Sequence, residues 1–145
     1  GGGGLIAGTS TYLKEVFPKI KNFSVEPEDF NDTQLSLREN KIISNTSSNL
    51  SICDSLLASE PGKLTFAVNR LTLNGGLVVS DYEVKKTIKY IAESLKIIVE
   101  PGGAVAAAAL LSKKIEVKNK IVVVMLSGGN IDHELFNKIV TEEYE

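Results

Sequence analysis

Apolar residues recur at helical spacing in the middle of the chain. Between residues 81 and 95 they fall at intervals of four, three and four, which places them on one face of a helix. These positions are Val84, Ile88, Ile91 and Leu95. Ser80 precedes the stretch and Glu83 follows three residues later, the spacing of a capping box. The pattern predicts a helix over residues 81–95 that begins directly after Ser80.

The remaining apolar stretches alternate between helix and strand patterns. Helices are expected from the first glycines to Pro18, from Pro27 to about Asn40, and over residues 64–73, 104–112 and 132–144. Short apolar runs near 22–26, 77–79, 97–99 and 121–126 are expected to be strands, and the β-branched run at 121–126 is the strongest. The alternation predicts an α/β fold with a mainly parallel, twisted sheet of at least four strands and helices on both faces.

The chain opens with four glycines, Gly1 to Gly4, and the apolar start of the first helix follows at Leu5. Glycine adds no packing surface, but it lets a turn adopt freely chosen dihedral angles and so converge its N–H groups on one point. At a helix N-terminus, these N–H groups and the helix dipole favour an anion such as phosphate. Taken alone, the stretch has a second interpretation as a polyglycine linker.

The composition is that of an ordinary globular domain. The 145 residues are 43% hydrophobic and 23% charged, and the net charge of −2 gives no electrostatic reason to expect nucleic acid or an anionic membrane as a partner. No apolar run reaches the ~18 residues that a membrane span needs. Cys53 is the only cysteine, which excludes an internal disulfide and a cysteine-based zinc site. We expect a cytoplasmic protein, and because the chain starts inside a motif without an initiator methionine, we interpret it as a fragment.

Five short motifs follow one another along nearly the whole chain. They are Gly-Gly-Gly-Gly-Leu at 1–5, Val-Glu-Pro at 25–27, Pro-Gly-Lys-Leu-Thr-Phe at 61–66, Val-Glu-Pro at 99–101 before a helix of small residues, and Ser-Gly-Gly-Asn-Ile-Asp at 127–132. In this order they resemble the pyridoxal-phosphate enzymes of the threonine dehydratase and serine racemase family, which have the type II fold. The resemblance argues against the linker interpretation of the glycines.

The resemblance implies that residues 1–145 are the C-terminal portion of the large, cofactor-binding domain of a longer polypeptide. In this family the Schiff-base lysine lies upstream of the tetraglycine, so we assign no catalytic residue to this chain and expect the fragment alone to be inactive. The implied activity of the full-length protein is that of a lyase, which dehydrates and deaminates a β-hydroxy amino acid such as serine, threonine or 3-hydroxyaspartate. A serine racemase of the same family and a non-catalytic phosphate- or nucleotide-binding α/β module are the alternatives. The expected partner is a small amino-acid substrate, and the full-length protein is expected to be a homodimer.

Two parts of the chain match the cofactor site of the family. The backbone amides of Gly1 to Gly4 and of Leu5 are implied to hold the phosphate of pyridoxal 5'-phosphate. Ser127 is implied to place its hydroxyl near the pyridine nitrogen. A neutral hydroxyl leaves that nitrogen largely unprotonated, and the resulting weaker electron sink suits elimination of a β-hydroxyl. Considered without the family, Ser127 is a turn or N-cap residue.

Glu26, Asp32 and the backbone carbonyl of Phe30 match the divalent-cation site of the metal-responsive members. All three offer hard oxygen ligands, which suit Mg²⁺ or Ca²⁺. The alternative is an acidic helix start that interacts with the helix dipole, a role open to Glu28 and Asp29.

One turn departs from the family pattern. Relatives usually carry Asp-Gly near the cofactor where this chain has Asp54-Ser55, and the local fit is in doubt if that glycine is needed for a positive φ. Glu100 has two interpretations, as a residue near the cofactor or as a cap of the helix that follows it. Cys53 is expected to be a core thiol, and His133 a surface residue at a helix start.

Overall fold

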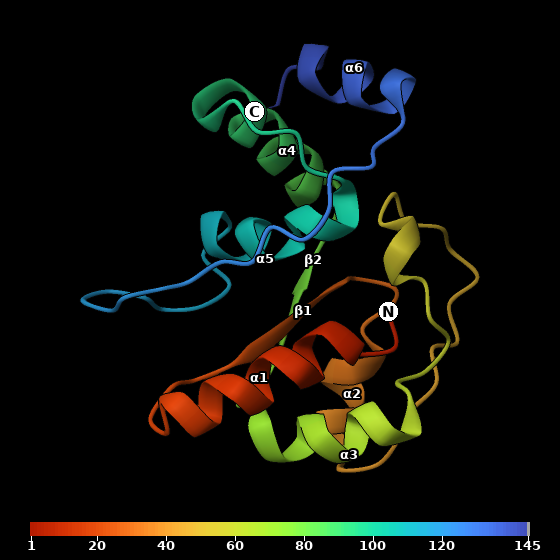
Figure 1. Ribbon diagram of the computed structural model, residues 1–145. Helices are drawn as coiled ribbons and strands as arrows, with labels where there is room; N and C mark the ends of the chain where they lie inside the picture. Colours follow the sequence, from red (N-terminus) through yellow and green to blue (C-terminus); the bar gives the residue numbers. More distant parts are fainter. Residues whose placement is uncertain (145) are drawn as a thin grey trace.

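The computed structural model describes residues 1–144, which form helices around a small sheet (Figure 1). The helices are α1 (Gly4–Val16), α2 (Asp32–Glu39), α3 (Lys63–Thr72), α4 (Asp81–Leu95), α5 (Pro101–Leu111) and α6 (His133–Thr141), with a short 3-10 helix, η1 (Asp54–Leu56). The strands are β1 (Phe23–Pro27) and β2 (Gly75–Val79). Helices that alternate with parallel strands confirm the predicted α/β class.

The two strands pair in parallel between two groups of helices. Their register runs from Phe23 opposite Gly75 to Pro27 opposite Val79. Figure 1 shows α1, α2 and α3 on one side of the sheet and α4, α5 and α6 on the other. Because side chains alternate along a strand, one face of the sheet contributes to the core around α5. The opposite face contacts α2, whose Gln34 side chain donates a hydrogen bond to Gly76 O at 3.1 Å.

The predicted helix over residues 81–95 is confirmed in its bounds and its cap. Ser80 Oγ accepts a hydrogen bond from the Glu83 N–H at 3.3 Å, and the Glu83 carboxylate accepts one from the Ser80 N–H at 2.8 Å. These reciprocal bonds form the predicted capping box. Val84, Ile88 and Ile91 of the apolar stripe are buried, so this face of α4 packs into the core.

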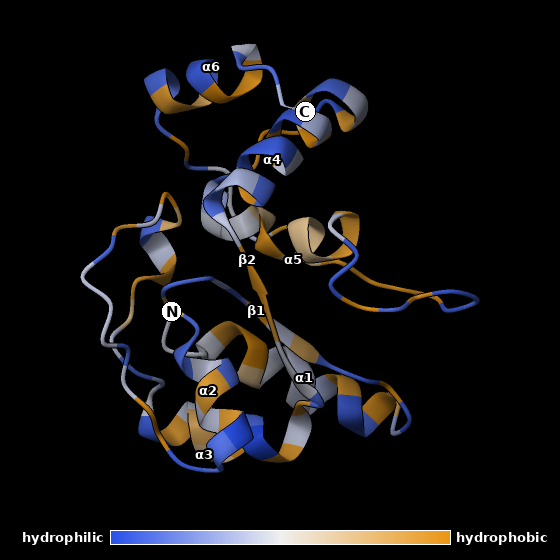
Figure 2. Ribbon diagram, turned by 180° about the vertical axis from the view of Figure 1, so that it is seen from behind, coloured by the Kyte–Doolittle hydropathy of each residue, from blue (hydrophilic) through white to orange (hydrophobic). Residues whose placement is uncertain are grey.

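Helix α5 lies at the centre of the core. Figure 2 shows its apolar character along most of its length, and eight of its eleven residues are buried. Helix α6 begins after Asp132, whose carboxylate accepts a hydrogen bond from the Leu135 N–H at 2.9 Å, and it ends at Thr141, earlier than predicted. Within residues 1–144, no helix has both the length and the apolar character needed to cross a membrane.

The prediction of at least four strands is wrong for the described residues, where only β1 and β2 form a sheet. Residues 97–99 and 121–126 have no strand pairing, although their β-branched composition favours it. Ile121 is 99% exposed and Val123 is 78% exposed. A strand forms only where a neighbouring backbone completes its ladder of hydrogen bonds, and composition alone does not supply that neighbour.

The helix predicted to start at Pro27 starts later, at Asp32. Pro27 instead ends β1 opposite Val79, and the next residue, Glu28, donates its N–H to Val79 O at 3.0 Å. Pairing with β2 therefore holds this segment extended. The tertiary contact outweighs the preference of proline for the first turn of a helix.

Candidate active-site region

The tetraglycine forms the turn that leads into α1. Gly3 has a φ of 83°, a left-handed conformation that favours glycine, and the helix begins at Gly4. The Ala7 N–H donates to Gly3 O at 3.0 Å, so the N–H groups of Gly4, Leu5 and Ile6 precede the first regular helical bond. A Cβ added at Gly4 would meet no atom within 4 Å. The space beside Gly4, at the positive end of the helix dipole, is therefore open.

Helix α3 binds the carbonyl groups of the same turn. Gly2 O accepts hydrogen bonds from the Gly62 N–H at 3.2 Å and from the Thr65 hydroxyl. Gly3 O accepts one from Asn69 Nδ2 at 3.4 Å. The motif at 61–66 contributed to the family resemblance, but the sequence analysis predicted no role for Thr65 or Asn69. Their spacing of four residues, which places two polar side chains on one face of α3, is the pattern that could have indicated this contact.

The Asp54-Ser55 turn in η1 lies between the glycine turn and α5. Ser55 O is 3.1 Å from the position that a Cβ would take at Gly1. The Ser55 hydroxyl occupies the space that a Cβ would need at Gly102, in the first turn of α5. The serine that departs from the family pattern is therefore accommodated because residue 102 is a glycine.

The turn at Ser127 and Gly128 packs against the N-terminus of α5. Ser127 O and Gly128 O each lie 2.9 Å from the position of a Cβ at Gly103, an approach that only glycine allows. Gly128 has a φ of 116°, and its own Cβ would lie 2.7 Å from Glu100 Cδ. Ser127 itself is exposed.

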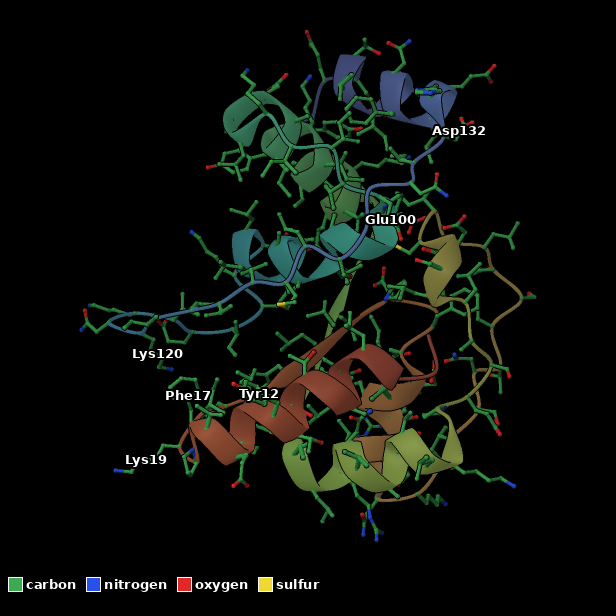
Figure 3. The ribbon with its side chains drawn as sticks, viewed as in Figure 1. Tyr12, Phe17, Lys19, Glu100, Lys120 and Asp132 are labelled. Carbon is green, nitrogen blue, oxygen red and sulfur yellow. The ribbon has the colours of Figure 1, made fainter. Side chains whose placement is uncertain are left out.

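Glu100 connects this turn to η1 (Figure 3). Glu100 Oε2 accepts a hydrogen bond from the Asn130 N–H at 3.1 Å, and Oε1 accepts one from Ser55 Oγ at 3.4 Å. Although Glu100 occupies the N-cap position of α5, its side chain makes no capping bond to that helix. Glu100 is therefore the N-cap residue of α5 through its backbone only, and its carboxylate instead joins the two turns beside that helix.

Glu26 caps α2. Its Oε1 accepts a hydrogen bond from the Thr33 N–H at 2.9 Å, and its Oε2 accepts one from the Gln34 N–H at 2.8 Å. The side chain is buried, and this burial raises the pKa of the carboxyl to about 7, although the two N–H donors act in the opposite direction. The interaction with a helix N-terminus thus falls to Glu26 itself, whereas Glu28 and Asp29 are exposed.

Asp32 and Phe30 do not form a metal centre with Glu26 in this structure. Asp32 Oδ1 accepts a hydrogen bond from Asn45 Nδ2 at 2.8 Å, and both Glu26 oxygens are bound by α2. Across residues 1–144 there is no group of three His, Cys, Asp or Glu side chains that could hold a metal ion. Of the two carboxylates expected to bind Mg²⁺ or Ca²⁺, only Asp32 has an oxygen without a hydrogen-bond partner among the described residues.

The predictions for Cys53, a core thiol, and for His133, a surface residue at a helix start, are confirmed. Cys53 is fully buried in the core, and burial raises the pKa of its thiol to about 12, which keeps it protonated. His133 is exposed as the first residue of α6. Neither residue takes part in the contacts around the glycine turn described above.

Comparison with known proteins identifies the family. A family model described as "Pyridoxal-phosphate dependent enzyme" matches residues 1–128. The chain belongs to this family. The matched range includes the glycine turn, the α3 motif and Ser127. The resemblance inferred from the five motifs is confirmed.

Similar proteins include both lyases and racemases. The chain is 36% identical over 141 residues to the L-threo-3-hydroxyaspartate ammonia-lyase of Saccharomyces cerevisiae, covering 97% of this chain and 43% of that protein. It is 37% identical over 143 residues to the serine racemase of Dictyostelium discoideum, covering 97% of this chain and 44% of that protein. Among solved structures, a threonine deaminase from T.th. matches with a TM-score of 0.85 at 32% identity, covering 91% of this chain and 48% of that chain. The type II fold is thereby confirmed, and the chain spans less than half the length of these relatives.

Proposed function

We propose that this chain is the C-terminal portion of a pyridoxal-phosphate-dependent ammonia-lyase that dehydrates and deaminates a β-hydroxy amino acid. The observation that carries the proposal is the glycine turn, where the space beside Gly4 is open while the carbonyl groups of Gly2 and Gly3 are bound by α3. Relatives named for L-threo-3-hydroxyaspartate and L-threonine ammonia-lyase activity support 3-hydroxyaspartate or threonine as the substrate, and serine is the third candidate from the sequence.

The residues of the chain fit the cofactor at two points. Pyridoxal 5'-phosphate, when bound, supplies the electron sink for reactions at the α-carbon of an amino acid. The N–H groups of Gly1 to Gly4 and of Leu5 would bind its phosphate, because an anion at a helix N-terminus is stabilised by unpaired amides and by the dipole. Ser127 would place a hydroxyl at the pyridine nitrogen. A hydroxyl can donate to the neutral nitrogen, whereas a carboxylate would stabilise its protonated form.

A serine racemase is the second candidate, and the 37% identity to the Dictyostelium discoideum enzyme favours it. Both activities require removal of the α-proton. In the lyase the β-hydroxyl then leaves, whereas in the racemase a proton returns from the opposite face of the cofactor. The residue that would deliver that proton is not assigned to this chain, so the two activities must be separated by their products.

The test uses a complete polypeptide that contains residues 1–145, purified with pyridoxal 5'-phosphate. Ammonia and an oxo acid released from L-serine, L-threonine or L-threo-3-hydroxyaspartate would support the lyase, and D-serine formed from L-serine would identify the racemase. The 145-residue chain alone is expected to turn over none of these substrates. If neither polypeptide binds the cofactor, the non-catalytic phosphate- or nucleotide-binding module becomes the better description.

A divalent cation is a separate proposal that rests on one atom. Asp32 Oδ2 is buried and has no hydrogen-bond partner among the described residues, so it could bind a cation. The Phe30 carbonyl, Glu26 and waters would complete the ligand shell of that cation. On this proposal Mg²⁺ or Ca²⁺ raises the melting temperature of the complete polypeptide, and Asp32→Asn removes most of the gain. A melting temperature that responds to neither the cations nor a chelator would overturn it.

The homodimer and the cytoplasmic location expected from the sequence also belong to this proposal. Size-exclusion chromatography with light scattering of the complete polypeptide tests the first, and fractionation of the source cells tests the second.

A further inference from the structure

The carbonyl groups of a glycine turn can work against anion binding. Glycine lets a peptide unit point either its N–H or its C=O toward the same region, and a C=O directed at phosphate is electrostatically unfavourable. A tetraglycine is therefore an effective anion site only if something else fixes the direction of its peptides. For Gly2 O such contacts come from a different helix, α3, and for Gly3 O a contact from α3 adds to the bond from the Ala7 N–H of α1.

We infer that Thr65 and Asn69 are positioning residues that hold the carbonyl groups of Gly2 and Gly3 toward α3, so that the N–H groups of the turn face the anion. The inference deepens the proposed function, because it rests on that function for the identity of the anion as the cofactor phosphate. The contacts themselves lie within the chain and do not depend on a ligand.

The first contact is made by Thr65. Its hydroxyl, on a half-buried side chain, donates to Gly2 O, which also accepts the Gly62 N–H at 3.2 Å. The same hydroxyl lies 2.9 Å from Gly62 O, so its single proton is shared between two carbonyl groups at the junction of the turn and α3. With two donors on one oxygen, rotation of the Gly2 peptide would break both bonds.

The second contact is made by Asn69, one helical turn further along α3. Asn69 is fully buried, and its Nδ2 donates to Gly3 O at 3.4 Å. Its Oδ1 is buried without a hydrogen-bond partner among the described residues. An unsatisfied buried acceptor is destabilising, so this asparagine is poorly explained by packing. Its amide is explained if the donor to Gly3 O is what the position requires.

The geometry at Gly3 shows how closely the two side chains of α3 fit the turn. A Cβ at Gly3 would lie 2.8 Å from Asn69 Nδ2 and 3.3 Å from Thr65 Oγ1. Both positioning side chains therefore contact the one glycine of the turn that has a left-handed φ. A side chain at this position would push the two donors away from the turn.

The test compares four variants of the complete polypeptide that contains residues 1–145 with the unaltered polypeptide. Thr65→Val removes the hydroxyl at nearly constant shape, and Thr65→Ser restores it. Thr72→Val is the matched control, because it removes a hydroxyl from the same helix. That hydroxyl bonds Ser10 Oγ at 2.7 Å and Val68 O at 3.2 Å, away from the turn. Asn69→Ser, which withdraws the amide, is the second probe of the positioning role and is measured alongside Thr65→Val.

Two measurements are made on each variant. Amide hydrogen exchange of Gly62 and Ala7 without ligand, scaled to exchange in α4, reports the order of the turn, because these N–H groups donate to Gly2 O and Gly3 O. The ratio of the affinities for pyridoxal 5'-phosphate and for pyridoxal, which lacks the phosphate, reports phosphate binding. We expect Thr65→Val to exchange about fivefold faster and to lose about fivefold of the phosphate preference, the effect of one hydrogen bond. Thr65→Ser and Thr72→Val should resemble the unaltered polypeptide in both measurements.

Unchanged exchange of Gly62 and Ala7 in both Thr65→Val and Asn69→Ser would overturn the positioning role. A different outcome would overturn the proposed function instead. If exchange accelerates as expected but the unaltered polypeptide does not prefer pyridoxal 5'-phosphate over pyridoxal, the positioning role is supported and the turn does not bind the cofactor phosphate.

Discussion

At the scale of single residues, Glu26 is a carboxyl group whose chemistry depends on the fold. Burial raises its pKa from 4.5 to about 7. Between these pH values the folded state holds a proton that the unfolded state has released, so the contribution to stability is present below pH 4.5 and is lost as the pH rises to about 7. The size of the shift corresponds to about 3 kcal/mol in the free energy of unfolding.

Glu26→Gln does not titrate, so its free energy of unfolding should vary less across this pH range than that of the unaltered chain. Asp32, whose pKa is also raised by burial, contributes with the same sign and leaves a residual slope. Urea denaturation at about pH 5 and about pH 7 measures the difference. Glu28→Gln, at an exposed neighbouring position, is the control and should keep the full slope. Equal slopes for all three chains would contradict the role of Glu26.

Substitutions at Gly3 and Gly4 distinguish the effect of the turn on stability from its effect on phosphate binding. Gly3→Ala should cost about 1–2 kcal/mol of stability, because any L-residue is strained at a left-handed φ and the new Cβ would contact Asn69. Gly4→Ala places its Cβ in open space on the side where the anion is proposed. It should keep the melting temperature and weaken binding of pyridoxal 5'-phosphate, measured by titration. Unchanged binding by Gly4→Ala would place the phosphate elsewhere.

At the scale of elements, the capping box of α4 tests how far local sequence alone sets the start of a helix. Ser80→Ala removes the side-chain acceptor of the Glu83 N–H and should lower the free energy of unfolding by about 1 kcal/mol. Ser80→Thr keeps a hydroxyl at the N-cap and should retain most of the stability. Urea denaturation of the two variants tests this, and a Ser80→Ala chain as stable as the unaltered one would show that tertiary packing alone sets the start of α4.

At the scale of the whole molecule, the segment 121–126 is an apolar stretch that lies partly outside the core. Ile121 and Val123 are 99% and 78% exposed, although apolar and β-branched residues normally become buried. Replacing both with lysine should leave the melting temperature of the chain unchanged and reduce its aggregation on heating, because an exposed apolar run favours association. Light scattering during thermal denaturation measures this. A large fall in melting temperature would show that the two side chains support the fold.

The sequence by itself determined the elements whose signals are local. The stripe and capping box of α4, the stop at Pro18 after α1 and the all-apolar α5 each depend on neighbours within about two helical turns. The order of the glycine, Val-Glu-Pro and Ser-Gly-Gly-Asn motifs also sufficed to predict the family and the glycine turn at the start of α1.

Only the tertiary structure decided the features that depend on distant partners. Residues 121–126 have the composition of a strand, but a strand also needs a paired neighbour. Pro27 ends β1 because β2 lies beside it, and Glu26 caps α2 because the strand brings its carboxylate to that helix. Thr65 and Asn69 reach Gly2 and Gly3 across more than sixty residues of sequence, and their local spacing can indicate a polar face on α3 but not the segment that this face contacts.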